Sequence, residues 1–295
     1  MIFAHRIQAA RRFFGLSLLC LATLAHAATE STAASALRTK YTELGGQLAS
    51  NAFKRPLVMN SIESSTMLKG DIYALIDHPF SQVSSALSGP AHWCDVLILH
   101  LNTKYCRPSS AAPGTILDMR IGKKFDQPIE DAHRVDFVFR QGGANVEYFD
   151  SRLDARKGPL GTSDYRILLE AVAVPGNKTF IHLTYSYAFG FASKIAMQAY
   201  LATVGRDKVG FSSTRQSDGK PEYIGGMRGV VERTTMRYYL AIDAYLNAPA
   251  ASQIERRLSD WFNATEQYPR QLHEMNRVAY LDMKRGEIQR QQAPY

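Results

Sequence analysis

This chain has few cysteines, no apolar segment of membrane-spanning length and none of the common catalytic motifs. Only three of its 295 residues are cysteine. The apolar run Phe13–Leu24 falls well short of the roughly 20 residues that a membrane-spanning helix needs, and no later run approaches that length. The sequence contains no P-loop, H-E-x-x-H, G-x-S-x-G or G-x-G-x-x-G motif. Nothing in it therefore indicates motif-based nucleotide binding, zinc peptidase chemistry or an α/β-hydrolase nucleophile.

The first 27 residues have the features of a secretory signal peptide. Arg6, Arg11 and Arg12 give a positive start without any acidic residue, and the short apolar run Phe13–Leu24 follows. The next three residues, "AHA", provide the small residues of a cleavage site. We therefore expect residues 1–27 to be removed near Ala27 and the mature protein to be periplasmic or secreted.

The positive charge of the chain is modest and dispersed. The full chain has a formal charge of +8, and removal of the signal peptide leaves 32 basic and 27 acidic residues, or +5 over 268 residues. The densest basic cluster is Arg256–Arg257, and no basic arm is present. Nucleic acid is therefore not an expected partner. Peripheral contact with an anionic membrane surface is left open.

The mature chain would keep two cysteines, Cys94 and Cys106, because Cys20 belongs to the signal peptide. An even number of cysteines in an oxidising compartment favours a disulfide bond. The bond needs Cα atoms within about 7 Å, whereas one continuous helix would place these two about 18 Å apart, so the chain must reverse direction between them. A zinc site formed by the two cysteines with His92 and His100 matches none of the usual spacings. We expect no metal and no cofactor.

Residue periodicity predicts an α+β protein. A strand is expected at 70–77 and a short helix from Phe80 to Leu87. Alternating apolar residues and short spacers then predict antiparallel strands at 115–121, 134–140, 144–153, 164–174 and 179–189. Helices are predicted at 192–205, at 227–246 and at 252–292 with a break near Pro269. We expect C-terminal helices to cover one face of a curved sheet.

Three segments carry a resemblance to a known superfamily. They are "GDIYALIDHPFSQVSSALSGPAHWC" (70–94), "TYSYAFG" (184–190) and "VVERTTMRYYLAIDAYL" (230–246). In these the chain resembles the START-like, helix-grip superfamily (SRPBCC), and in particular an exported bacterial branch with no established activity. The resemblance implies a curved antiparallel sheet wrapped around a long C-terminal helix, with a ligand cavity between them. It spans Gly70 to Leu246, with an insertion at 191–226.

The resemblance also suggests how the chain is divided. After the signal peptide, residues 28–69 would form an N-terminal linker, a weak helix and a lead-in strand. The helix-grip domain would occupy residues 70–247, and residues 248–295 would be a helical C-terminal extension.

Candidate site residues follow from the faces of the predicted elements. His100, Asn102 and Lys104 recur at every second position, as on one face of a strand, which is either solvated or directed into the cavity. Tyr185 and Tyr187 share the other candidate strand face, which would line the cavity if it is concave. On the gripping helix, Tyr238 and Ile242 complete the predicted ligand-binding set.

Three functions are weighed. The first is an exported protein that binds a hydrophobic or amphipathic ligand, such as a lipid, in the cavity between sheet and helix. The second is a cyclase-type or hydrolase-type enzyme whose general base would be His100 or His182, although no catalytic residue is assigned. The third is an envelope module that uses its helical tail to bind another protein. The sequence does not identify a protein partner.

Overall fold

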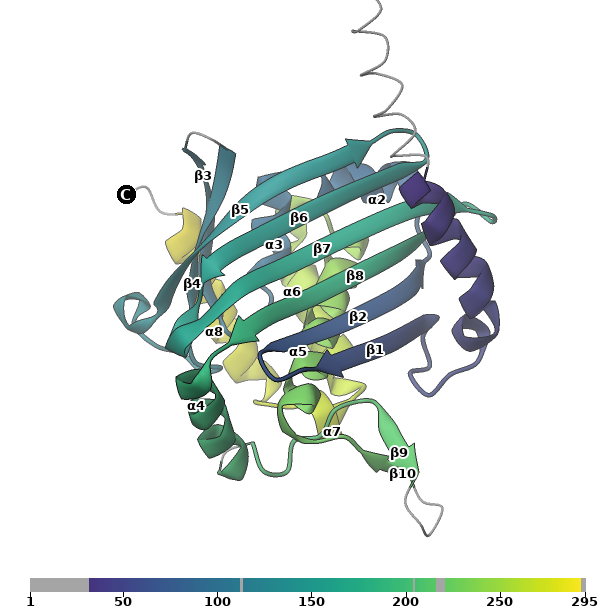
Figure 1. Cartoon of the computed structure of the whole chain (residues 1–295). Helices are drawn as coiled ribbons and strands as arrows, with labels where there is room; N and C mark the ends of the chain where they lie inside the picture. The colour runs from purple at the N-terminus through teal and green to yellow at the C-terminus, as the bar shows by residue number, and fades with distance from the viewer. Residues whose placement is uncertain (1–31, 112–113, 204, 216–220, 293–295) are drawn as a thin grey trace, which may run out of the picture.

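The computed structural model of this protein describes residues 32–111, 114–203, 205–215 and 221–292 (Figure 1). The predicted signal peptide, residues 1–27, lies outside the described residues. The strands of the main sheet are β1 (Leu57–Glu63), β2 (Met67–Ile76), β3 (Thr103–Ala111), β4 (Gly114–Ile121), β5 (His133–Ala144), β6 (Tyr148–Lys157), β7 (Thr162–Val174) and β8 (Lys178–Phe189). They pair antiparallel in the order β1-β2-β8-β7-β6-β5-β4-β3. A separate short hairpin pairs β9 (Ser213–Arg215) with β10 (Pro221–Tyr223).

Helices lie at both ends of the chain and between the strands. The first occupies residues 32–49. The others are α2 (Phe80–Leu87), α3 (Pro90–Leu97), α4 (Phe191–Ala202), α5 (Gly226–Asn247), α6 (Ile254–Glu266), α7 (Pro269–Leu272) and α8 (Arg277–Gln292). Short 3₁₀ turns occupy Ile129–Asp131, Pro159–Gly161 and Ala251–Gln253. Among the described residues, no helix is both long and apolar enough to cross a membrane.

The long helix α5 packs against the inner face of the sheet, on β1, β2 and β8. Gly70 marks the closest approach, because a Cβ atom at this position of β2 would overlap the Thr235 hydroxyl of α5. The helices α2, α3 and α6 lie behind the same face (Figure 1). This arrangement is the helix-grip form of an α+β fold, so the fold class predicted from the sequence is confirmed.

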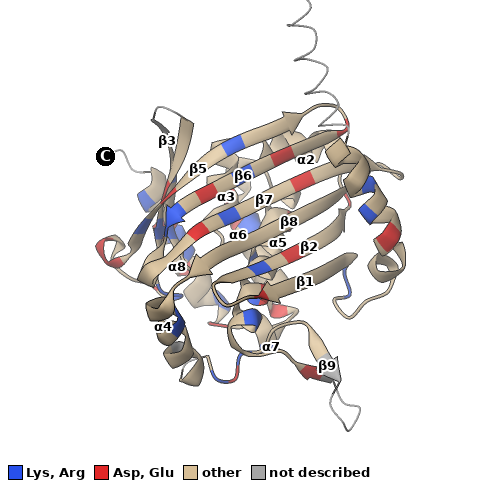
Figure 2. Ribbon diagram, in the orientation of Figure 1, with Lys and Arg blue, Asp and Glu red and all other residues tan. Residues whose placement is uncertain are grey.

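Strand alternation separates the two faces of the sheet. On β8, Leu183, Tyr185 and Tyr187 are buried in the core beneath the sheet, while His182 projects from the outer face. Lys and Arg residues alternate with Asp and Glu residues along the strands of the sheet (Figure 2). The N-terminal helix covers one end of this outer face, where Leu37, Leu44 and Leu48 pack in a small second core.

The helix α5 differs from the one-sided amphipathic helix that its sequence predicts. An amphipathic helix usually turns its charged residues to solvent, yet Glu232, Arg233 and Arg237 are all buried. The reason is that α5 is covered twice, by the sheet on one side and by α6, α7 and the segment around Phe211 on the other. The Glu232 carboxylate, for example, accepts hydrogen bonds from the backbone N–H groups of Phe211 and Ser212.

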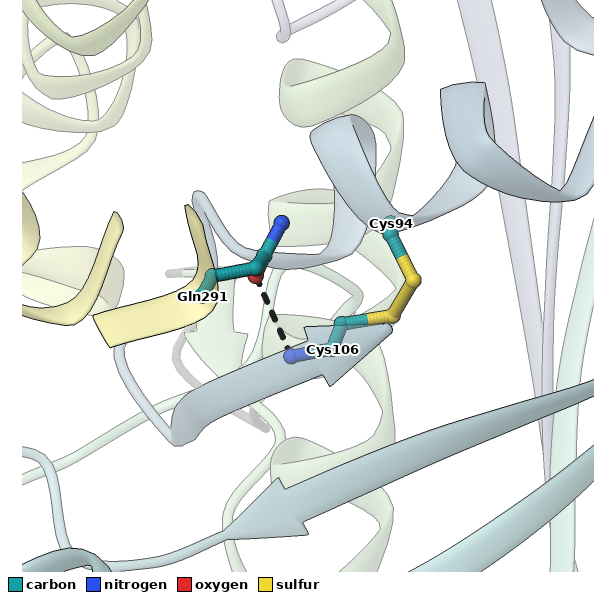
Figure 3. The surroundings of a disulfide bond; sticks show 3 residues. All are labelled: Cys94, Cys106 and Gln291. Atoms are coloured by element: carbon teal, nitrogen blue, oxygen red, sulfur yellow. Dashed lines mark hydrogen bonds between the residues drawn. A yellow bond between two sulfur atoms is a disulfide. The ribbon is translucent and has the colours of Figure 1, made fainter. Parts of the chain in front are cut away.

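The predicted disulfide bond between Cys94 and Cys106 is present (Figure 3). The two Cα atoms are 5.2 Å apart. Cys94 lies in α3 and Cys106 in β3, so the chain does reverse direction between them. The backbone N–H of Cys106 also donates to Gln291 Oε1 of α8 at 3.1 Å, which brings the C-terminal helix to the same point.

Candidate functional site

Four tyrosines and one histidine form a continuous aromatic cluster between the sheet and α5. Tyr185 of β8 lies 5.3 Å from Tyr238 of α5 and 5.7 Å from Tyr187, measured between ring centroids. Tyr165 of β7 stacks on Tyr187 at 5.2 Å. At the other end, the His100 ring lies 5.1 Å from the Tyr238 ring. The cluster therefore runs from the start of β7 to the turn that precedes β3.

Tyr165 is the member of this cluster that sequence reasoning missed. It continues the buried alternation of Ile167 and Leu169 along β7, and this period of two was a signal that could have found it. The pairing of β7 with β8 shifts between Ser163 and Arg166, and Asp164 there has a φ of 51°. An irregularity of this kind locally redirects side chains next to a site.

His100 is held as a hydrogen-bond donor. Its Nδ1 accepts the backbone N–H of Asn102 at 3.2 Å, so the proton of the neutral imidazole resides on Nε2. Burial lowers the pKa of His100 well below its ordinary value, and nearby cations lower it further, so the ring is neutral at pH 7. The Nε2 atom is buried and has no hydrogen-bond partner among the described residues.

The tyrosine side chains next to His100 are largely buried as well. Tyr185, Tyr187 and Tyr238 keep only 7%, 5% and 7% of their surface exposed. Burial raises the pKa of each phenol above its ordinary value, so all three stay protonated. Within the described part of the chain, no hydrogen bond joins these three hydroxyls to another group, whereas the Tyr165 hydroxyl lies 2.8 Å from Thr162 Oγ1.

A fully buried ionic group lies next to the His100 turn. Glu287 of α8 binds Lys104 of β3 at 2.9 Å and Lys284 at 2.7 Å, and all three side chains are completely buried. The Lys284 ammonium also donates to the backbone carbonyls of His100 and Thr103. Burial lowers the pKa of Lys284 to about 8. The C-terminal helix thus fixes the backbone that presents His100.

A second ionic group centres on Glu274, between α7 and α8. Its carboxylate binds Arg237 of α5 at 2.8 Å, Lys124 at 2.5 Å and Lys208 at 3.7 Å. Burial, together with the positive charge of Arg237, lowers the pKa of Lys124 to about 8. One carboxylate is therefore shared by three cations in a largely desolvated place.

The predicted site residues divide into two sets. His100, Tyr185, Tyr187 and Tyr238 are brought together in the aromatic cluster, and Ile242 lies fully buried one turn further along α5. The prediction that His100, Asn102 and Lys104 share one strand face is wrong. The strand begins only at Thr103, and His100 and Asn102 lie in the turn before it.

Asn102 and Lys104 do not join the aromatic cluster. Asn102 Nδ2 donates to the Gly122 carbonyl at 2.6 Å, which ties the turn to the end of β4. The Lys104 ammonium is saturated by Glu287, the Phe125 carbonyl and the Met283 sulfur. Their polar atoms are therefore used within the protein.

His182 lies on the outer face of the sheet. Its two ring nitrogens bind Asp71 at 2.9 Å and Glu170 at 3.0 Å, and its ring stacks on Tyr73 at 4.2 Å. Burial alone would lower the pKa of His182, but the hydrogen bonds to the two carboxylates outweigh it and raise the pKa. The two contacts favour the protonated ring, with a carboxylate at each nitrogen.

Two hollows lie at the surface of the described residues. A surface groove of about 700 Å³ lies between the N-terminal helix and the segment around Arg55, and a hollow of about 210 Å³ lies beside the disulfide bond. Neither hollow is lined by a residue of the aromatic cluster. No group of three or more His, Cys, Asp and Glu side chains within the described ranges is arranged to hold a metal ion.

Comparison with known proteins gives no family. No protein-family model and no curated protein matches the sequence. Among solved structures, human StAR-related lipid transfer protein 5 is 8% identical, covering 75% of this chain and 97% of its own, with a TM-score of 0.35. A truncated norcoclaurine synthase from Thalictrum flavum is 16% identical, and the match covers 49% of this chain and 86% of the synthase, with a TM-score of 0.32. A protein from Arthrobacter aurescens is 13% identical, and the match covers 65% of this chain and 92% of that protein, with a TM-score of 0.30. The helix-grip class rests on the strand order and the position of α5.

Proposed function

We propose that this protein binds a small hydrophobic or amphipathic molecule, such as a lipid, between the curved sheet and α5. The observation that carries the proposal is the buried His100 Nε2–H, which has no hydrogen-bond partner among the described residues and lies beside the rings of Tyr238 and Tyr185. Leaving a buried donor unsatisfied costs about 1–3 kcal/mol, and native proteins rarely do so. The polar group of a ligand would supply the missing acceptor.

The rest of the ligand would be held by apolar contact. Tyrosine rings offer broad apolar faces, and each Å² of apolar surface removed from water contributes about 25 cal/mol. Because the Tyr185 ring lies only 5.3 Å from Tyr238 and 5.7 Å from Tyr187, a ligand that enters between these rings must separate them. We propose that it selects a minor conformation in which the rings of Tyr185, Tyr187 and Tyr238 lie further apart.

We also propose that the protein acts outside the cytoplasm. The disulfide bond between Cys94 and Cys106 supports this, because such bonds persist mainly in oxidising compartments. The signal-peptide pattern of residues 1–27 points the same way. The modest positive charge of the mature chain would favour transient contact with an anionic membrane as a source of ligand.

The enzymatic alternative has weaker support. His100 uses its acceptor nitrogen for the Asn102 N–H, and both nitrogens of His182 face carboxylates. Neither histidine therefore presents a basic nitrogen to a substrate, as a general base must.

Binding can be tested with N-phenyl-1-naphthylamine, a neutral dye whose fluorescence rises in apolar surroundings. We expect saturable binding to residues 28–295 and displacement of the dye by lipid extract. Tyr238→Phe removes one unpaired hydroxyl and should weaken binding about two- to tenfold, the worth of one hydrogen bond. Tyr73→Phe, on the outer face, is the matched control and should bind as the wild type does. Absence of saturable binding, or equal loss in both variants, would reject the proposal.

A further inference from the structure

The ion pairs that the described residues form near the His100 turn join more cations than carboxylates. Five cations bind the two carboxylates Glu274 and Glu287. The cations come from β3, α5, α8 and two loops: Lys104, Lys124, Lys208, Arg237 and Lys284. An excess of this kind is costly in a desolvated place, because little water is present to screen it.

The imidazole of His100 lies within the field of this cluster. The four charges that act on it most strongly are all positive, and they belong to Arg237, Lys284, Lys124 and Lys104. Its unpaired Nε2–H group is thus a hydrogen-bond donor in a positive field. Such a donor favours a charged acceptor over a neutral one, because the hydrogen bond and the field then act together.

The other end of the aromatic cluster has no comparable charge. Tyr165 stacks on Tyr187, and the Phe137 ring meets Tyr165 edge-on at 6.2 Å. Tyr238 connects this apolar end to His100. The cluster is therefore polarised along its length, with a donor and positive charge at one end and aromatic faces at the other.

We infer that the ligand is an amphipathic anion, whose carboxylate, sulfonate or phosphate oxygen accepts the His100 Nε2–H bond while its apolar body lies among the tyrosine rings. This inference rests on the proposed binding function and specifies the chemical class of the ligand.

The test compares two dyes that share one apolar body. The neutral dye is N-phenyl-1-naphthylamine, and the anionic dye is 1-anilinonaphthalene-8-sulfonate, which adds a single sulfonate group. We expect the anionic dye to bind at least about tenfold more tightly to residues 28–295 and to be displaced by the neutral dye. Lys124→Gln, at a partly exposed cation of the cluster, should reduce this preference several-fold, and so should His100→Leu.

Arg285→Gln provides the matched control, because it removes one positive charge from the exposed side of α8, where Arg285 binds Glu255. It should leave the preference unchanged. Equal affinity for the two dyes would overturn the inference while leaving the proposed function intact. Equal loss of preference in Lys124→Gln and Arg285→Gln would also overturn it, because the preference would then reflect overall charge. If neither dye binds, the proposed function itself fails.

Discussion

Reduction of the disulfide bond between Cys94 and Cys106 offers the most direct test of how the His100 turn is held. The bond closes a loop with a sequence separation of 12 residues. The chain-entropy relation gives about 10 cal/mol/K for a loop of that size, which is about 3 kcal/mol at room temperature. We therefore expect reduction to lower the free energy of unfolding by about 3 kcal/mol without unfolding the protein, because the sheet ladder does not depend on this bond.

Urea denaturation of the oxidised and reduced protein measures this difference. With a slope of about 2–3 kcal/mol/M, the midpoint should fall by about 1–1.5 M on reduction. Comparing two redox states of one sequence avoids the loss of packing that a Cys94→Ala substitution would add. A decrease below about 1 kcal/mol would refute the reasoning, since it would mean that α3 and β3 stay together in the denatured chain.

Three further substitutions test the packing and the ionic groups. Gly70→Ala should destabilise the fold by about 1–3 kcal/mol, because its Cβ would overlap Thr235. Gly45→Ala meets open space in the N-terminal helix and should stabilise the fold by up to about 1 kcal/mol. Thermal melting should therefore show a lower melting temperature for the first variant and a higher one for the second. Glu287→Gln should cost about 3–5 kcal/mol in urea denaturation, because it leaves two buried lysines uncompensated. His182→Asn should destabilise most near pH 5–6. The raised pKa of His182 means that its contribution is complete below about pH 6.5 and is lost at higher pH, while its carboxylate partners, whose pKa values are lowered, lose theirs as the pH falls below about 4. A pH-independent difference between His182→Asn and wild type would contradict this assignment.

Features that depend on a single physical rule were predicted correctly from the sequence. Period-two alternation identified the strands from β4 to β8, because one face of each packs on the core and the other is polar. The disulfide bond followed from compartment and parity. Tyr185 and Tyr187 were correctly assigned to one face, since alternation fixes direction even when the partner element is unknown.

Features that depend on contacts between distant elements were not predicted correctly from the sequence. Polar residues at 100, 102 and 104 imitate strand alternation, but the backbone there forms a turn after α3. Arg237 is a charged residue in the middle of α5, and its burial depends on partners far along the chain, among them Glu274, 37 residues later. Lys104 similarly requires Glu287, 183 positions away. Buried charges of this type cannot be recognised until the element carrying their partner is placed.

The same ionic contacts change how the C-terminal extension should be regarded. If α8 were a detachable interface for another protein, deleting it would leave the rest intact. Instead, α8 supplies Glu287 and Lys284, and the latter holds the His100 carbonyl at 2.6 Å. Truncation before Arg277 would leave Lys104 buried without its carboxylate, so we expect loss of folded protein in urea denaturation and not merely loss of a partner.

A test of the interface hypothesis must therefore alter only the outward side of α8. Val278 is suitable, because it is 68% exposed on a helix whose inner side is buried. Val278→Asp should keep the urea midpoint of the wild type, whereas a partner that docks on this surface would be lost in a pull-down. If Val278→Asp instead destabilises the fold as much as Glu287→Gln does, the division of α8 into a structural inner side and a free outer side is wrong.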